Sequence, residues 1–244
     1  MLEEKTGRAG KFPLPPDCPG FPTECEKNMD LDIRIVELIA SRLCHDLVSP
    51  VGAIRNGLEL IEEMNEEDES NPSFMGEAIK LIDHSSLQAD RRLRVFRLAY
   101  GMAGRDQKGF GEARSAVEGW VEGSRTTLDW PAGQPSDWAA VRTGLVKVVL
   151  NTVVLAEAAL THGGTVTVAG EGSAEGGRIT VTAQGRPGAL SADAEAALKG
   201  ATAIEDLTPR TVHAYITGRF AETYGVRLTA APAGPEVLAF TLEW

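Results

Sequence analysis

Apolar residues recur in steps of three and four along two long stretches near the start of the chain, as on the buried side of a helix. In the first stretch, residues 31–66, these positions are Val36, Ala40, Leu43, Leu47, Val51, Ile54, Leu58 and Ile61. In the second stretch, which ends near residue 100, they are Met75, Ile79, Ile82, Ser86, Ala89, Leu93, Phe96 and Tyr100. The acidic run at 62–69 and the sequence SNP at 70–72 separate the two stretches. The pattern predicts two antiparallel helices joined by a short turn.

A single helical hairpin cannot enclose both of its own apolar seams. Two copies that pair through residues 31–104 would bury the seams in a four-helix bundle. We therefore expect a homodimer.

The pattern changes after about residue 110, where short alternating segments typical of strands are mixed with helical ones. We expect strands at 127–130, 165–170, 178–183, 226–231 and 237–243, and helices at 111–123, 136–162 and 209–224. Helices stacked on one face of a mixed sheet are the expected architecture. The fold class is thus α + α/β, with a helical domain at 31–104 and an α/β domain at 111–244.

The composition of the chain argues against several classes of protein. The chain has 244 residues, a formal net charge of -11 and a pI of about 4.9, which argues against a nucleic-acid binder. Its three cysteines form no CxxC pair, so neither a disulfide framework nor a metal site is indicated. No apolar run approaches the roughly 18 residues of a membrane span, and we expect a soluble, cytoplasmic protein. Residues 1–30 are proline-rich and aperiodic, which predicts a disordered arm or a vector remnant.

His45 is the candidate reactive residue, within SRLCHDLVSPVGAIRNGLELIEE at 41–63. It lies about 200° around the helix from Leu43, so it faces away from the apolar seam. Small residues follow it along the same outer stripe: Ser49, Gly52 and Asn56. An exposed histidine is most often an ordinary surface residue. Asp46 favours a function here, because a carboxylate bonded to one ring nitrogen leaves the other as a nucleophile.

HDLVSP resembles the H-box of sensor histidine kinases, in which a histidine and an acidic residue precede Ser, Thr or Asn and then proline. The wider stretch SRLCHDLVSPVGAIRNGLELIE is more similar to the ChpT-type histidine phosphotransferases of alphaproteobacteria. This resemblance implies that His45 accepts a phosphoryl group from one receiver aspartate and passes it to another, with Asp46 assisting. It also implies a helical bundle followed by an ATPase-like sandwich of the Bergerat type.

The nucleotide-binding motifs of the histidine kinase family are incomplete in this chain. LNTVVLAEAALTHGG at 150–164 resembles the N-box, but Leu155 stands where an asparagine would coordinate the metal. TAQGRPG at 182–188 has Ala183 where an aspartate would bind adenine. Leucine and alanine offer no oxygen ligand to Mg²⁺ or to the adenine amino group. We expect the domain to bind no cofactor or metal, and the partner receiver to supply Mg²⁺.

Basic residues are predicted to receive an acidic partner near His45. A turn about residue 69 places position 93 level with His45, where Arg91, Arg92, Arg94 and Arg97 cluster near Arg42 and Arg55. Such a band would attract receivers, but the arginines would equally well pair with nearby acids. The predicted receiver-binding residues are Arg42, Ser49, Gly52, Arg55, Asn56, Arg91 and Arg94. His84, His162 and His213 are interpreted as structural or surface residues.

The sequence therefore predicts a dimeric phosphorelay protein without autokinase activity. By resemblance, its partners are the receiver of a CckA-like hybrid histidine kinase and the CtrA-like and CpdR-like response regulators, with no nucleic acid and no membrane. Two alternatives stay open: an ATP-dependent histidine kinase with an unusual pocket, and a scaffold that docks receivers without chemistry.

Overall fold

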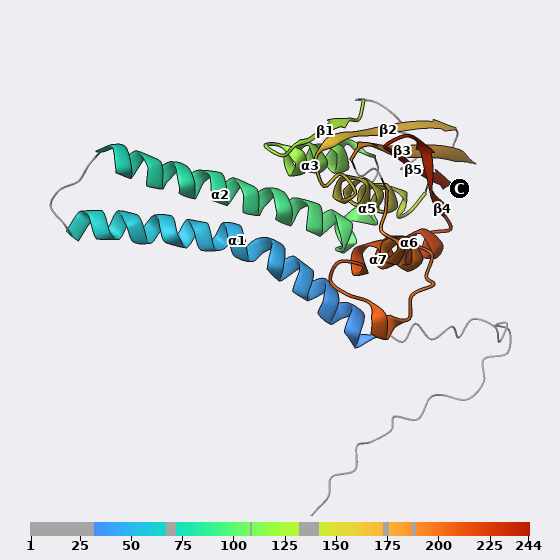
Figure 1. Cartoon of the computed structure of the whole chain (residues 1–244), viewed down its shortest axis with the longest axis horizontal. Coiled ribbons are helices and arrows are strands. Elements are labelled where there is room, and N and C mark those ends of the chain that lie inside the picture. Colours follow the sequence, from blue (N-terminus) through green and yellow to red (C-terminus); the bar gives the residue numbers. More distant parts are fainter. Residues whose placement is uncertain (1–31, 67–71, 108, 132–141, 173–175, 187–188) are drawn as a thin grey trace, which may run out of the picture. The chain divides into compact units, whose positions relative to one another are not determined.

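The computed structural model describes residues 32–66, 72–107, 109–131, 142–172, 176–186 and 189–244. The predicted arm at 1–30 and the turn about residue 69 lie outside these residues. The fold is of the α+β kind, with two long helices followed by a five-stranded sheet and its helices (Figure 1). Within the described residues, no helix combines the length and the apolar character needed to cross a bilayer.

The two long helices are α1, Ile33–Glu66, and α2, Pro72–Ala99, and they pack side by side (Figure 1). They run antiparallel, because Gly57 lies against Ile82 while Asp46, earlier in α1, contacts Arg92, later in α2. Gly57 is required by this close approach, since a Cβ there would lie 2.6 Å from Cγ1 of Ile82. The helical pattern and the predicted level of position 93 with His45 are confirmed.

The sheet has the order β1-β2-β3-β5-β4, in which β1 and β2 are parallel and the other neighbours are antiparallel. The strands are β1 Thr126–Asp129, β2 Gly164–Gly172, β3 Gly177–Gly185, β4 Arg227–Gly234 and β5 Val237–Glu243. Alternate residues of β3 and β5 are buried, and α5 packs against this face. The predicted mixed sheet with helices on one face is confirmed.

The helices of this part are α3 Gly111–Val121, α5 Leu145–Ala158, α6 Ala192–Leu198 and α7 Val212–Thr223, with 3-10 turns at Met102–Gly104 and Ile204–Asp206. The prediction of one helix over 136–162 was too long. Residues 132–141 lie outside the described residues, and Gly144 adopts a φ of +80° just before α5 begins. The short helix α6 was missed, because its seven residues are too few to show a helical period.

The main core lies between α5 and the sheet. Leu145 to Ala156 of α5 are all buried, and α2, α3 and α7 pack around that helix. Because α2 contacts α5 directly, the end of the hairpin is fixed to the α/β part of the chain.

Candidate functional site

His45 projects from the middle of α1 with 88% of its side chain exposed. Its Nδ1 lies 3.2 Å from Oδ1 of Asp46, whose side chain is 23% exposed. An ionised carboxylate only accepts hydrogen bonds, so Nδ1 is the donor and carries the proton. Nε2 then keeps its lone pair, and the exposure of the side chain leaves this nitrogen available to a partner.

The surface along α1 beyond His45 has little side-chain cover, as the sequence predicts. Ser49 and Asn56 are exposed, and a Cβ added at Gly52 would meet no atom within 4 Å. Pro50 lies inside α1 and is buried, and the carbonyl of Asp46 accepts a hydrogen bond from Nη1 of Arg92. The turn of α1 that carries the imidazole is therefore in direct contact with α2.

Most of the arginines predicted near His45 form ion pairs with acids. Arg94 pairs with Asp90 at 2.8 Å, and Arg55 pairs with Glu59 at 2.8 Å. Arg91 pairs with Glu122 of the segment after α3 and is largely buried. Arg55 and Arg94 stay exposed, so they remain accessible to a partner.

Arg42 lies on the same side of α1 as Ser49, seven residues before it, but its guanidinium group reaches toward the loop before α7. It is half-buried, its Nη1 lies 3.5 Å from the carbonyl oxygen of Pro209, and its Nε is buried without a hydrogen-bond partner. Part of its side chain is therefore covered by the loop before α7, and its predicted contact with a receiver stays a prediction. The local pattern does not show this contact, because the loop is more than 160 residues away in sequence.

The asparagine of the incomplete N-box, Asn151, is fully buried in α5 and binds backbone. Its Nδ2 donates to the carbonyl oxygens of Ala99 at 2.9 Å and of Lys147 at 2.8 Å. Lys147 Nζ donates to the carbonyl oxygens of Tyr100 at 3.1 Å and Gly101 at 2.9 Å. These bonds satisfy the carbonyl of Ala99 at the end of α2 and the two carbonyls that follow it, where a cation is also favourable to the helix dipole.

The other two positions of the nucleotide motifs belong to the core. Leu155 of α5 and Ala183 of β3 are 5% and 0% exposed and pack within the main hydrophobic cluster. Neither side chain offers an oxygen or nitrogen atom to a metal or an adenine ring.

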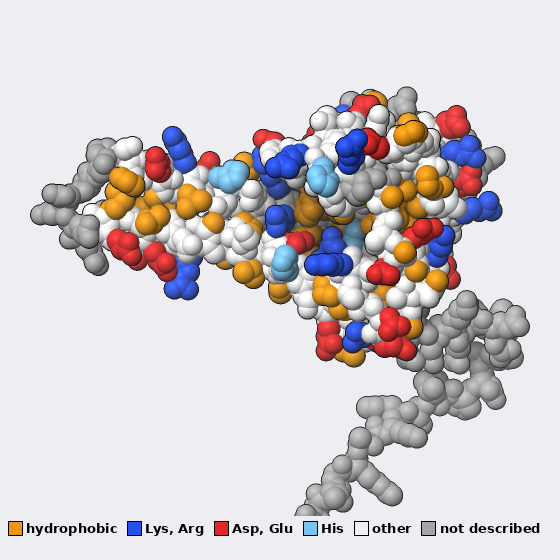
Figure 2. All heavy atoms as spheres, in the orientation of Figure 1, with side chains coloured by type: hydrophobic (Ala, Val, Ile, Leu, Met, Phe, Trp, Pro, Cys, Tyr) orange, Lys and Arg blue, Asp and Glu red, His pale blue; other side chains and the backbone are white. Residues whose placement is uncertain are grey.

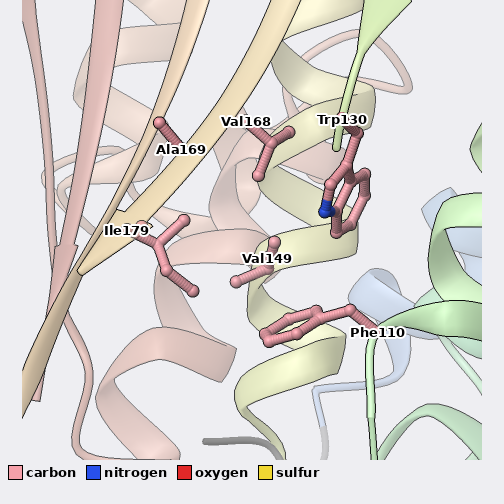
Figure 3. A pocket seen from close by; sticks show the side chains of 7 residues that line it. Phe110, Trp130, Val149, Val168, Ala169 and Ile179 are labelled. Carbon is pink, nitrogen blue, oxygen red and sulfur yellow. The ribbon is translucent and has the colours of Figure 1, made fainter. Parts of the chain in front are cut away.

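An apolar pocket lies between α5 and the sheet, with Phe110, Trp130, Val149 and Ile179 around it (Figure 3). It has no room for a water molecule. We interpret it as incomplete packing of the core.

His213 of α7 is fully buried and hydrogen-bonded on both ring nitrogens. Nδ1 lies 2.8 Å from the hydroxyl oxygen of Tyr100, and Nε2 lies 3.1 Å from the carbonyl oxygen of Asn151. Burial, and then the charge of Arg42, lowers the pKa of His213 from 6.5 to about 3. Burial likewise raises the pKa of Tyr100 to about 12. The structural interpretation of His213 agrees with this environment.

Stability should fall below neutral pH because of His213. The ring stays neutral in the folded protein but takes up a proton near pH 6.5 in the unfolded chain, so acid favours unfolding. We expect the free energy of unfolding to fall by about 2 kcal/mol between pH 7 and pH 5 from this group. Urea unfolding at both pH values measures it. The His213→Gln protein should lose less stability over the same interval, and an equal loss would contradict the assignment.

Comparison with known proteins points to one family. Residues 110–236 match the family model of the histidine phosphotransferase C-terminal domain. The protein phosphotransferase ChpT of Brucella abortus (strain 2308) is 30% identical over 208 residues, which cover 84% of this chain and 93% of that protein. A bacterial phosphotransferase of known structure is 28% identical, with a TM-score of 0.68 over 86% of this chain and 96% of that one.

Proposed function

This chain belongs to the histidine phosphotransferases of the ChpT type and acts in phosphoryl transfer within a phosphorelay, and we propose that His45 carries the phosphoryl group. The observation that carries the proposal is the geometry of the imidazole. Nδ1 is held by Asp46, while the exposed side chain offers Nε2 to a partner.

The chemistry needs little more than position. Nε2 attacks the phosphorus of an aspartyl phosphate on a receiver, a P–N bond forms, and the P–O bond to the receiver carboxylate breaks. The resulting phosphoramidate reacts in reverse with the aspartate of a second receiver. Asp46 stabilises the imidazolium character of the ring in both steps. Mg²⁺ in the receiver's own site neutralises charge on the transferring group.

Receiver domains are the partners, and they approach along the exposed face of α1 around His45. Ser49, Gly52 and Asn56 provide close access, while Arg55 and Arg94 supply exposed positive charge to an acidic receiver. Arg91 and Arg42 are each partly covered by contacts within the chain, Arg91 with Glu122 and Arg42 with the loop before α7. The donor is the receiver of a CckA-like hybrid kinase, and the acceptors are CtrA-like and CpdR-like response regulators.

The α/β part is a histidine-kinase ATPase-like sandwich of the Bergerat type that does not bind ATP. The burial of Leu155 and Ala183 among apolar side chains supports this, as does the use of Asn151 to hold α2. The rival function is an ATP-dependent histidine kinase.

Labelled ATP and labelled phospho-receiver, offered separately with Mg²⁺, distinguish these functions. We expect the protein to take label from the receiver and none from ATP, and calorimetry to show no micromolar ATP binding. Label from ATP would establish the kinase instead. Label from neither source would leave a docking scaffold.

The chain forms a homodimer through α1 and α2. Within the described residues, every exposed large hydrophobic side chain except Met102 lies on these two helices, and Figure 2 shows such side chains along them. Val51, Leu58, Ile79 and Leu93 are each about half exposed. Leu58 lies about 140° around α1 from His45, so a four-helix bundle built on this face leaves His45 open.

Leu58→Asp should convert the dimer to a folded monomer, because it places a carboxylate in the centre of an apolar contact. Light scattering at micromolar concentration measures the mass, and circular dichroism confirms folding. Leu60→Asp is the matched control. Leu60 is as exposed as Leu58 but lies about 160° away on α1, so this variant should stay dimeric. A monomeric wild-type protein would refute the dimer.

A further inference from the structure

We propose that Arg92 is a positioning residue for phosphotransfer, because it replaces the backbone hydrogen bond that Pro50 removes beside His45. The inference rests on the proposed role of His45. It concerns how the chain holds the turn of α1 that presents the imidazole.

Pro50 leaves one carbonyl next to His45 without its helical donor. In an α-helix the carbonyl of residue i accepts a hydrogen bond from the N–H of residue i+4. For Asp46 that residue is Pro50, which has no N–H and whose ring crowds the same carbonyl. Without another donor, α1 would bend or open at the turn that contains His45 and Asp46.

Arg92 supplies the missing donor from α2. Its Nη1 donates to the carbonyl oxygen of Asp46, a hydrogen bond between residues 46 positions apart in sequence. The carbonyl belongs to the same residue whose carboxylate holds Nδ1 of His45. One side chain therefore fixes the backbone from which both the nucleophile and its orienting carboxylate project, and it fixes the level of α1 against α2.

Arg92 differs from the neighbouring arginines in its contact, and this difference argues against a role in receiver docking. Arg91 pairs with Glu122 and Arg94 pairs with Asp90, whereas the contact of the half-buried Arg92 is with backbone of α1. A hydrogen bond from a charged donor is among the stronger ones in proteins, and Arg is suited to it because its fork of donors is rigid. Arg92 thus holds the backbone of α1 in place and is not a receiver-binding residue.

A double-mutant cycle with Arg92→Met and Pro50→Ala tests this role. Alanine at position 50 restores an N–H to the carbonyl of Asp46, so Arg92 should become dispensable. We expect Arg92→Met to lower the maximal transfer rate from a phosphorylated receiver about tenfold, which equals about 1.4 kcal/mol, with an unchanged KM for the receiver. In the Pro50→Ala background the same substitution should cost less than about threefold.

Controls keep the cycle interpretable. Lys80→Met removes a positive charge from α2 about three turns from Arg92 and should leave the rate unchanged. Rates are normalised to folded protein by circular dichroism. Should Arg92→Met fail to fold, Arg92→Lys in both backgrounds replaces it, since lysine keeps the charge but loses the rigid fork.

An equal loss of rate in both backgrounds would overturn the inference, because it would mean that Arg92 does not act through the carbonyl of Asp46. A change confined to the KM for the receiver would also overturn it and assign Arg92 to docking. Failure of the proposed function would look different. In that case the His45→Ala protein would keep transferring, whatever residue stands at position 92.

Discussion

We expect the His45→Ala protein to take up no phosphoryl group from a phosphorylated receiver and to keep its fold. Uptake should be lost because the imidazole is the proposed nucleophile. The fold should be kept because the imidazole has no structural role. With 88% of the side chain exposed, its loss removes little packing. The transfer rate should fall to background, since a missing nucleophile is not compensated by binding alone.

His84→Ala is the matched control for this experiment. His84 is also an exposed histidine on a long helix, where it contacts Gln88, and it should transfer at the wild-type rate. In the wild-type protein the bound label should be labile in acid and stable in alkali, as phosphohistidine is. Wild-type labelling of the His45→Ala protein would show that another residue carries the group.

Asp46→Asn gives a graded result at the same site. Asparagine keeps the size of the side chain but removes the charge that stabilises an imidazolium ring. Transfer should slow by about tenfold to a hundredfold while receiver binding persists. The measurement is the transfer rate at saturating receiver.

Asn151→Ala should destabilise the protein by about 3 kcal/mol. The substitution removes two buried hydrogen bonds and leaves the carbonyl of Ala99, at the end of α2, without this donor. Urea unfolding followed by circular dichroism measures the change. Amide hydrogen exchange near Ala99 should accelerate as well, because the end of α2 loses its attachment to α5.

Thr152→Val is the control for this loss. Thr152 is the next residue of α5, is equally buried, and donates from Oγ1 to the carbonyl of Val148 within its own helix. Its loss should cost less than about 1 kcal/mol, because that carbonyl keeps its backbone partner. If Asn151→Ala lowered the free energy of unfolding no more than Thr152→Val does, the hydrogen bond to Ala99 would contribute little to stability.

The local pattern of the sequence determined most of the elements. A period of three to four residues found α1 and α2, and alternation found all five strands of the sheet. The exposure of His45 followed from its angle around α1, which depends on helix geometry alone. The similarity of HDLVSP to a known motif gave the candidate chemistry, and family comparison agrees with it.

The sequence also predicts that Pro50 removes one helical hydrogen bond and bends the helix just past His45. Because Pro50 stands four residues after Asp46, it implies a carbonyl without a donor. Nothing in the local pattern says which side chain supplies the missing bond, and Arg92 was grouped with its neighbours as a surface cation.

Only the tertiary structure decided what the long polar side chains do. Arg92, Arg42 and Asn151 each bind a backbone carbonyl of a segment about 50 or more residues away. Periodicity reports which side of a helix is apolar, but it does not report which distant segment covers the other sides. A long side chain also reaches beyond its own turn, so its partner depends on how the elements pack. For this reason the positions of α1, α2 and the nucleophile are local properties of the sequence, whereas the contacts that hold them in place arise from the packed fold.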